Sequence, residues 1–600
     1  MSPNTLVDRL VEIRAALSPT FTRDGRQLLH LADDSGQWQI WALDLGSGMR
    51  RQLTFHDEPV AFLARAPRSD AVVYGVDCGG DERQQLHLLP GEGGAATALT
   101  ARPAAIHQWG AFAPDGIRIA YTSNAGNGVD FDLYLRDLDP TGGSERRLAA
   151  MAGMNSVASW GGDGSHIVIL EERSHFDHEL HLVETASGAV RRLPRRHGRA
   201  RYAAVRWRKD GSGFFCLTEL GGEHMGIARY DRAADEFRPL YMDPRGDVEA
   251  LSVAPKAAAI AAAVNRAGWS ELLLIDPKSG AAEPVGGLPQ GVVADLAWSP
   301  DGARLAFSLS APTIPRELWL LDMATRTPRR LLPAETGALD PAALVPWQLG
   351  EFASFDGRTI PTWLAVPQGP APAGGRKSVV WVHGGPEGQT RPIFRPDIQA
   401  LTGQGYAVML PNLRGSTGYG RSYAALDDGR ARPDCIEDLR QARLWLGRQA
   451  AIDDGAVAVM GQSYGGFMVL ATLVQHPELW RAAIKNYGFA DFLTLLRDTG
   501  PWRHRHRAAE YGDPEADRDF LAALSPLGSA HCIRAPLLVT HGLRDPRVPP
   551  SESHALIAAL RERDHPVETL IFPHAGHGYI GRHLRRTAFR AFVDFLARHL

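Results

Sequence analysis

The stretch Gly461-Gln462-Ser463-Tyr464-Gly465 has the residue types and spacing of a serine nucleophile on a sharp turn. An apolar run at residues 457–460 precedes it, and a helix-like run at 466–471 follows it. Flanking glycines let the backbone turn tightly and keep the serine exposed. A serine hydroxyl becomes a strong nucleophile only when a neighbouring base takes its proton. The pattern therefore predicts an acid and then a histidine further along the chain.

Both partners are present in the predicted order. Asp545 follows an apolar run at residues 537–540, and His577 follows another at 569–572 and lies between two glycines. Each residue alone has a plain explanation, as a turn serine, a strand-end aspartate or a surface-loop histidine. The order serine, aspartate, histidine, each after an apolar strand, is that of an α/β-hydrolase and not that of chymotrypsin or subtilisin. We therefore interpret the three residues as a catalytic triad.

A glycine-rich loop supplies a candidate oxyanion hole. The apolar run at residues 378–382 ends in His383-Gly384-Gly385-Pro386. Such a loop can point a backbone N–H at a developing oxyanion, and the residue after the nucleophile supplies a second N–H. We expect these donors to be Gly385 and Tyr464; the alternative interpretation of the loop is an ordinary turn.

The segment from Trp502 to Arg507 is strongly basic and lies after the nucleophile in the sequence. Loops in this part of a hydrolase overhang the site, and arginine binds carboxylates through two parallel hydrogen bonds. Three residues are therefore candidates for a clamp on the C-terminal carboxylate of a peptide: Arg503, Arg505 and Arg507. The alternative is a solvated helix face whose arginines pair with Glu510 and Asp513.

The composition restricts the function classes. The chain has 600 residues, 44% hydrophobic and 22% charged, which is typical of soluble proteins and too long for one core. A net charge of −3 gives no general affinity for nucleic acid or anionic membranes. Because neither a signal peptide nor a run of ~20 apolar residues is seen, and the four cysteines are scattered, we expect a cytoplasmic protein. We expect no cofactor and no metal; His175, His178 and His181 resemble a ligand set only loosely.

The first half of the chain is a repeat. A unit of apolar strand, Asp-Gly turn, apolar strand and a third strand ending in Asp recurs about every 46 residues, in the range of propeller blades. Clear copies of the turn lie at Asp24-Gly25, Asp115-Gly116 and Asp301-Gly302. Seven copies fit, which predicts a seven-bladed β-propeller over residues 17–338.

The second half alternates strand-like and helix-like segments after an initial hairpin at residues 352–366. Alternation of this kind predicts a mostly parallel sheet with helices on both faces, that is, an α/β-hydrolase domain over residues 339–600. The amphipathic segment within residues 1–16 precedes the first blade, and we expect it to be helical and to pack back on the hydrolase domain.

A propeller ahead of a hydrolase with this triad resembles the prolyl oligopeptidase family of serine peptidases. The motifs that carry the resemblance are the residues around Ser463, the segment 412–420, the segment 541–545 and the 383–386 loop. The last of these resembles the acylaminoacyl-peptidase branch. No Glu-Glu pair that would bind a free amino terminus is expected in the propeller, and Asp81-Glu82 is the nearest acidic pair to this pattern. Dipeptidyl-peptidase activity is therefore not expected.

The resemblance implies a serine peptidase for short peptides, size-selected by the propeller, of acylaminoacyl-peptidase or carboxypeptidase-like type. Homo-oligomers are compatible with it. It implies that Ser463 attacks the scissile carbonyl, that His577 moves the proton and that Asp545 orients the imidazole. Two rival functions stay open: a carboxylesterase for small acyl esters, since the same triad cleaves esters, and a non-catalytic binding protein that uses the propeller face.

Overall fold

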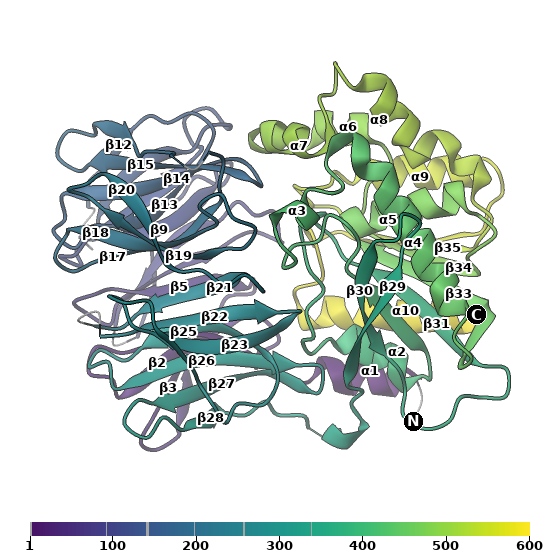
Figure 1. Cartoon of the computed structure of the whole chain (residues 1–600), viewed down its shortest axis with the longest axis horizontal. Helices are drawn as coiled ribbons and strands as arrows, with labels where there is room; N and C mark the ends of the chain where they lie inside the picture. Colours follow the sequence, from purple (N-terminus) through teal and green to yellow (C-terminus); the bar gives the residue numbers. More distant parts are fainter. Residues whose placement is uncertain (1–2, 92, 140–142, 197, 256–257, 338) are drawn as a thin grey trace.

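The computed structural model describes residues 3–91, 93–139, 143–196, 198–255, 258–337 and 339–600. These residues form two bodies that lie side by side: an all-β ring from the first half and a helix-covered sheet from the second (Figure 1). The expected domain boundary at residue 338 lies outside the described residues. The first strand begins at Ala16, so the segment ahead of the ring is one residue shorter than expected.

The ring is the seven-bladed propeller that the repeat predicts. Within the described residues, each blade is a four-stranded antiparallel sheet whose strands neighbour one another in chain order. The first four blades consist of β1 (Ala16–Phe21), β2 (Gln27–Ala32), β3 (Gln39–Asp44), β4 (Arg50–Gln52); β5 (Val60–Arg65), β6 (Val72–Val76), β7 (Gln85–Leu89), β8 (Thr97–Ala98); β9 (His107–Phe112), β10 (Arg118–Ser123), β11 (Asp132–Asp137), β12 (Glu145–Ala149); β13 (Met154–Trp160), β14 (His166–Ser174), β15 (Asp177–Glu184) and β16 (Val190–Arg192). The last three consist of β17 (Tyr202–Trp207), β18 (Gly213–Thr218), β19 (Gly226–Asp231), β20 (Glu236–Tyr241); β21 (Val248–Val253), β22 (Ile260–Arg266), β23 (Trp269–Ile275), β24 (Ala282–Pro284); β25 (Val292–Trp298), β26 (Arg304–Ala311), β27 (Ile314–Asp322) and β28 (Pro328–Leu332).

The repeated Asp-Gly turns join the first and second strands of the blades. Between β1 and β2, the carboxylate of Asp24 accepts hydrogen bonds from Thr22 Oγ1 (2.8 Å) and Arg26 N (2.9 Å). Between β25 and β26, Asp301 accepts from Ser299 Oγ (2.6 Å) and Ala303 N (3.0 Å) in the same way. The aspartate side chain thus fixes each turn, which explains why this residue recurs in the sequence.

The ring closes by packing of the first blade on the last. β1 packs against β25, β26 and β27, and the two blades share a buried apolar cluster. Ser18 N donates to Asp295 Oδ2 (3.2 Å), and Arg304 Nη2 donates to the carbonyl of Gly25 (2.8 Å). Because both blades are built from consecutive strands, side-chain contacts hold this junction together.

The second body is one eight-stranded sheet in the order β29-β30-β32-β31-β33-β34-β35-β36. The β29–β30–β32 pairs are antiparallel and the remaining pairs are parallel. Its strands are β29 (Trp347–Ala353), β30 (Thr359–Ala365), β31 (Arg376–Val382), β32 (Ala407–Pro411), β33 (Ile452–Gln462), β34 (Ala482–Asn486), β35 (Leu537–Gly542) and β36 (Val567–Phe572). Its helices are α2 (Pro396–Gly403), α3 (Arg421–Ala424), α4 (Arg432–Gly447), α5 (Tyr464–Gln475), α6 (Phe492–Asp498), α7 (His504–Tyr511), α8 (Arg518–Leu524), α9 (Ser551–Arg561) and α10 (Arg582–His599). The predicted α/β architecture is confirmed.

Each face of this sheet packs on its own apolar core. One core joins the sheet to α4, α5 and α9, and the other joins it to α2 and α10. The N-terminal helix α1 (Pro3–Val11) packs on α2 and α10, and its Val7, Leu10 and Val11 are buried in the second core. The chain thus begins on the hydrolase body before it enters the propeller. Within the described residues, no helix combines the length and apolar composition needed to cross a membrane.

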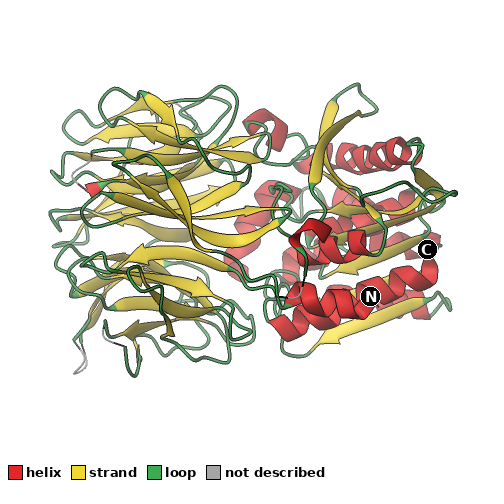
Figure 2. Ribbon diagram, turned by 90° about the horizontal axis from the view of Figure 1, so that it is seen from below, coloured by secondary structure: helices red, strands yellow, loops and turns green. Residues whose placement is uncertain are grey.

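The carboxyl ends of the parallel strands lie at one edge of the sheet and face the propeller. The register pairs Val382 with Gly461 and Gly542 with Phe572, so the loops that follow β31, β33, β35 and β36 leave the sheet at the same level. Seen from below, the sheet and helices lie beside the ring along its whole width (Figure 2). This arrangement brings side chains from distant parts of the sequence into one cleft.

Candidate active site

Ser463 lies on a strained turn between β33 and α5. Its backbone has φ 55° and ψ −123°, a conformation that residues other than glycine rarely adopt. The turn is closely packed: a Cβ on Gly461 would lie 2.2 Å from the carbonyl oxygen of Gly465, and a Cβ on Gly465 would lie 2.2 Å from that of Val382. Both glycines of the motif are therefore required by close backbone approach.

The three predicted triad side chains are joined by hydrogen bonds. His577 Nε2 lies 2.9 Å from Ser463 Oγ, and His577 Nδ1 lies 2.7 Å from Asp545 Oδ2. Asp545 follows β35 and His577 follows β36, so both come from loops at the same edge of the sheet as the serine. This is the geometry in which an imidazole can take the serine proton while a carboxylate fixes its tautomer.

Asp545 is buried and fully hydrogen-bonded. Its Oδ1 accepts from the backbone N–H groups of Arg547 (2.9 Å) and Val548 (3.0 Å), and His541 Nε2 lies 3.3 Å from its Oδ2. Burial alone would raise the pKa of Asp545, but the neighbouring His577 and the hydrogen bonds hold that pKa well below its usual range. The carboxyl group therefore stays ionised over the whole range in which histidine titrates.

The glycine loop after β31 packs directly on the nucleophile. A Cβ on Gly384 would lie 2.9 Å from Ser463 Cβ, and Gly385 lines the cavities on both sides of the serine. His383 anchors the loop, because its Nδ1 contacts the carbonyl of Gly384 (2.8 Å) and its Nε2 contacts Ser416 Oγ (2.9 Å). At the start of α5, the N–H of Tyr464 belongs to the first helical turn, where backbone donors have no partner within the helix.

Three cavities meet at this site. A cavity of about 450 Å³ extends from Ser463 past Tyr487, and a smaller one of about 110 Å³ lies beside Tyr464. A third, of about 570 Å³, is lined mostly by the propeller. Arg547 lines all three, and Ser463 and His577 line the first two. The side chains of the predicted triad thus lie where a chamber on the propeller side adjoins two pockets of the hydrolase body.

Comparison with known proteins identifies the family. Residues 392–600 match the model described as the prolyl oligopeptidase family. The dipeptidyl aminopeptidase BIII of Pseudoxanthomonas mexicana is 27% identical over 611 residues, which span 96% of this chain and 86% of that protein. This chain belongs to the prolyl oligopeptidase family.

Further members and structures resemble this prolyl oligopeptidase-family chain. The acylamino-acid-releasing enzyme of Homo sapiens is 28% identical over 261 residues, 42% of this chain and 35% of that protein. The crystal structure of a puromycin hydrolase matches with a TM-score of 0.86 at 21% identity, over 98% of this chain and 96% of the other. An acylaminoacyl peptidase structure matches with a TM-score of 0.75 at 19% identity, over 99% and 97% of the two chains. The structural matches establish the shared fold, and the predicted class, a serine peptidase, is confirmed.

The propeller of this peptidase touches the histidine loop itself. The loop between β6 and β7 packs so tightly that a Cβ on Gly576 would lie 1.8 Å from the carbonyl oxygen of Gly80. In the same loop, Glu82 forms an ion pair with Arg547 (2.6 Å). These contacts were not foreseen, since nothing in the sequence distinguishes this loop from other blade connections.

The three arginines predicted to bind a carboxylate lie in different surroundings. Arg503 and Arg507 line the 110 Å³ pocket beside Ser463, but within the described residues Arg505 is exposed and lines none of the three cavities. The prediction of Arg505 as a ligand is therefore wrong. Residues four apart lie on one face of a helical segment, whereas the residue midway between them points to the opposite side.

The alternative partners expected for these arginines are also wrong. Glu510 is paired with Arg432 Nη2 (2.6 Å), and Asp513 accepts backbone hydrogen bonds in its own turn. Arg507 instead faces Glu387, which follows the glycine loop, at 3.8 Å. Contrary to the expectation from the sequence, the propeller does contain a Glu-Glu pair: Glu171 and Glu172 are adjacent on β14, and Glu172 pairs with His506 of α7 (2.9 Å).

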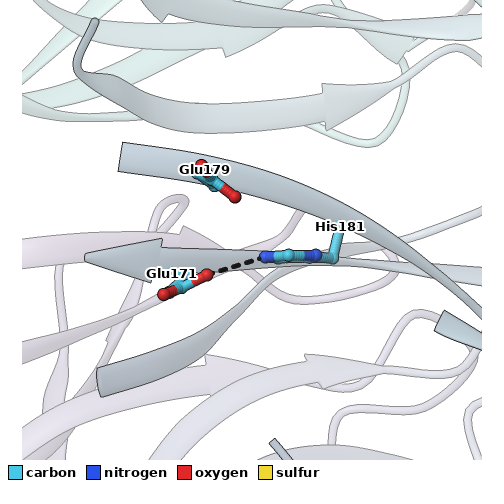
Figure 3. A group of neighbouring side chains, drawn as sticks. All are labelled: Glu171, Glu179 and His181. Carbon is cyan, nitrogen blue, oxygen red and sulfur yellow. Dashed lines mark hydrogen bonds and ion pairs between the residues drawn. The ribbon is translucent and has the colours of Figure 1, made fainter. Parts of the chain in front are cut away.

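The loosely histidine-rich segment does not form a three-histidine set. Among the described residues, His181 is joined by Glu171 and Glu179, whose ligand atoms lie within 4.8 Å of one another (Figure 3). Glu179 is already paired with Arg173, Arg192 and Arg195, each at 2.7 Å. Guanidinium groups thus neutralise these carboxylates, and we interpret the group as an ion-pair network that ties three strands of one blade together.

Beneath Tyr464, residues that the sequence did not single out anchor the nucleophile helix. Arg432 is fully buried and donates to Asp427 Oδ2 (2.7 Å) and to the Tyr464 hydroxyl (2.8 Å). In the 412–420 segment, Arg414 binds Asp438 with two hydrogen bonds of 2.8 Å. Of these two arginines, only Arg414 lies in a segment that the sequence analysis had associated with the family.

Proposed function

We propose that this peptidase cleaves short, unfolded peptides through an acyl-enzyme formed on Ser463. The observation that carries the proposal is the continuous hydrogen-bond chain from Ser463 through His577 to Asp545, at the junction of cavities that the propeller covers. Peptide substrates are expected of the family. As part of the same proposal, the enzyme acts as an acylaminoacyl peptidase or in a carboxypeptidase-like mode.

In the first half of the reaction, Ser463 Oγ attacks the scissile carbonyl carbon while His577 Nε2 takes its proton. The oxyanion of the tetrahedral intermediate receives hydrogen bonds from the N–H groups of Tyr464 and Gly385. His577 then gives the proton to the leaving amine, which departs with its peptide. Asp545 stays ionised and stabilises the imidazolium throughout.

In the second half, water replaces the amine. His577 takes a proton from the water, the resulting hydroxide attacks the ester carbonyl, and the proton passes to Ser463 Oγ as the acid leaves. Each proton that the imidazole accepts is returned within the same half-reaction. The residues of this chain therefore account for both steps.

The propeller supports selection by size. It covers the carboxyl edge of the sheet and contacts the hydrolase near the catalytic loops, through Gly80 and Glu82 on one blade and Glu172 on another. A folded protein does not fit cavities of a few hundred cubic ångströms, whereas an extended peptide does.

A fluorophosphonate probe tests the chemistry. It should label the native protein and fail on Ser463→Ala, and peptides of two to ten residues should be cleaved while folded proteins stay intact. Absence of labelling would favour the non-catalytic rival. Simple esters cleaved far faster than any peptide would favour the carboxylesterase.

A second candidate is release of dipeptides from a free N-terminus, as the name of the Pseudoxanthomonas relative states for that protein. The specific observation is carboxylates on the propeller side: Asp77 and Glu82 line the chamber that shares Arg547 with the catalytic pockets, and Glu172 faces α7. Burial raises the pKa of Asp77 to about 6. Carboxylates in the chamber that adjoins the catalytic pockets suit a terminal ammonium group.

Acetylation separates the two modes. A dipeptide coumarin amide with a free amino terminus should be hydrolysed at least ~10-fold faster than its acetylated form if an ammonium group is bound by a carboxylate. Glu82→Gln or Glu172→Gln should reduce that ratio. Faster hydrolysis of the acetylated form would favour the acylaminoacyl mode instead.

A further inference from the structure

Two cavities meet at Ser463, and they must receive the two sides of the scissile bond. The larger one runs past Tyr487, whose ring packs 4.9 Å from that of His577 between centroids, where the leaving amine takes up its proton. The smaller one is lined by Ser463, Tyr464 and Gly385 together, the nucleophile and both proposed oxyanion donors. The acyl residue, one bond from the attacked carbonyl carbon, therefore places its side chain in the smaller pocket.

This acyl pocket combines an apolar wall with cationic ends. Phe489, Leu495 and Val548 line it, as do Arg503 and Arg507. Its volume of about 110 Å³ suits a single side chain. A pocket for an apolar residue would not need charged groups at this depth, because burying a cation without a partner carries a large desolvation penalty.

Arg503 is the unbalanced cation. Within the described residues, no carboxylate lies at ion-pairing distance from it, and its Nε is buried without a hydrogen-bond partner. Burial, reinforced by the positive charges of Arg507 and Arg547, lowers the pKa of Arg503 to about 10.

The neighbouring arginines both have carboxylates close to them. Arg547 is paired with Glu82 at 2.6 Å. Arg507 Nη1 faces Glu387 at 3.8 Å without a hydrogen bond. Burial alone would lower the pKa of Arg507, but neighbouring groups, among them Glu387, Glu510 and Glu172, raise that pKa. Of these three guanidinium groups, Arg503 is the one without an ion-pair partner among the described residues. A substrate carboxylate bound at Arg503, beside Arg507, would supply the anion that Arg503 lacks.

We propose that Arg503 and Arg507 select an acidic residue, glutamate or aspartate, on the acyl side of the scissile bond. This inference rests on the proposed function and names the substrate class of the same site. It replaces the clamp on a C-terminal carboxylate expected from the sequence, because that carboxylate belongs to the leaving-group side and this pocket lies on the acyl side. Both ligands are carboxylates, so the experiment separates the two sources.

The test uses coumarin amides of Ala-Glu and Ala-Gln, each with a free and with an acetylated amino terminus. Neither substrate has a C-terminal carboxylate, and the ratio of kcat/KM is taken within each pair, so the result does not depend on the N-terminal mode. We expect a Glu over Gln preference of ~10- to 100-fold, as for a charge-assisted hydrogen bond in a closed site. A ratio near one overturns the inference.

Three variants locate the preference. Arg503→Gln should bring the ratio close to one by lowering kcat/KM for the Glu substrate far more than for the Gln substrate, and Arg503→Lys should retain part of the preference. Arg505→Gln, two residues away and exposed, should leave the ratio unchanged. An unaltered ratio in Arg503→Gln overturns the assignment, and Arg503 has no ion-pair partner among the described residues whose loss would complicate folding.

Two controls keep the outcomes distinct. Peptides Ala-Gln-Phe-Ala with free and amidated C-termini report the other carboxylate source: a preference for the free acid that disappears in Arg503→Gln supports the C-terminal clamp and overturns the inference. Fluorophosphonate labelling reports the catalytic centre. Labelling without a Glu preference rejects this inference alone, whereas absence of both labelling and hydrolysis rejects the proposed function with it.

Discussion

The propeller and the hydrolase body use their sequences in opposite ways. In the propeller, strands pair with their neighbours in the chain, and the same aspartate turn fixes blade after blade. In the hydrolase body, β31 lies between β32 and β33, so strands distant in the sequence pair and their loops gather at one edge. Repeated local pairing of strands forms the propeller, whereas pairing between strands distant in the sequence brings the loops of the candidate active site together.

The difference shows where each body is sensitive to change. The catalytic side chains all come from the hydrolase edge, while the propeller contributes close backbone contact and counter-charges at a few points. Four experiments, from the largest expected effect to the smallest, test whether this division is correct.

Ser463→Ala should lower kcat/KM for any peptide amide by about 10⁴- to 10⁶-fold, because the acyl-enzyme can no longer form. Removing one oxygen from a half-buried side chain creates little empty space and should leave the thermal midpoint of both bodies nearly unchanged. Steady-state kinetics and calorimetry measure the two quantities. Residual activity within 100-fold of native would mean that another group carries the chemistry.

Gly576→Ala tests whether the propeller positions the histidine. The new methyl group would meet the carbonyl oxygen of Gly80 at 1.8 Å, so either the blade loop or the His577 loop must move. A displacement of about 1 Å at a catalytic group can cost ~10²-fold in rate, which is the expected loss in kcat. Gly286→Ala is the matched control in the propeller, since no described atom lies within 4 Å of the added carbon. Equal, small effects in both variants would show that the propeller contact does not affect catalysis.

Buried Lys485 should make the stability of the hydrolase body depend on pH. Its ammonium group contacts Ser553 Oγ at 2.5 Å, and burial lowers its pKa to about 7. An unfolded lysine keeps its proton up to about pH 10.4, so the unfolded chain binds more protons than the native one between these values. Stability from this group therefore rises with pH across that window, by up to about 1.4 kcal/mol per pH unit.

Lys485→Met should remove this dependence. The stability difference between the variant and the native protein, followed by denaturant unfolding from pH 7 to 9, should favour the variant most at pH 7 and shrink as pH rises. A difference that stays constant with pH would contradict the lowered pKa.

Glu82→Gln tests the ion pair between the bodies. Both side chains of the Glu82–Arg547 pair are partly exposed, 32% and 47%, and such pairs contribute ~0.2–1 kcal/mol. We expect a change in KM of less than ~5-fold that fades at high salt. Glu283→Gln, an exposed residue on β24, is the control. A loss as large as that of Gly576→Ala would mean that the pair, and not the backbone contact, aligns the two bodies.

Much of this architecture follows from local patterns. The Asp-Gly turns predicted the blades, because a side chain that caps its own turn leaves a mark at a fixed position. The nucleophile motif predicted a strand, a turn and a helix at Ser463, since only glycine fits at 461 and 465. The predictions about Arg505 and about Glu510 were wrong because they used neighbourhood in the sequence, whereas helix geometry and long-range partners decided the outcome.

The sequence by itself determined the fold of each body and predicted which serine, aspartate and histidine form the proposed triad, because turn chemistry and strand–loop spacing are short-range properties of the chain. The tertiary structure alone decided which charges face the substrate. Arg503 and Arg507 line a pocket with Ser463, Arg507 faces Glu387, and Gly80 touches the histidine loop. The last two contacts join segments that lie about 100 to 500 residues apart. Electrostatic balance depends on distances in space, and no local pattern encodes those distances.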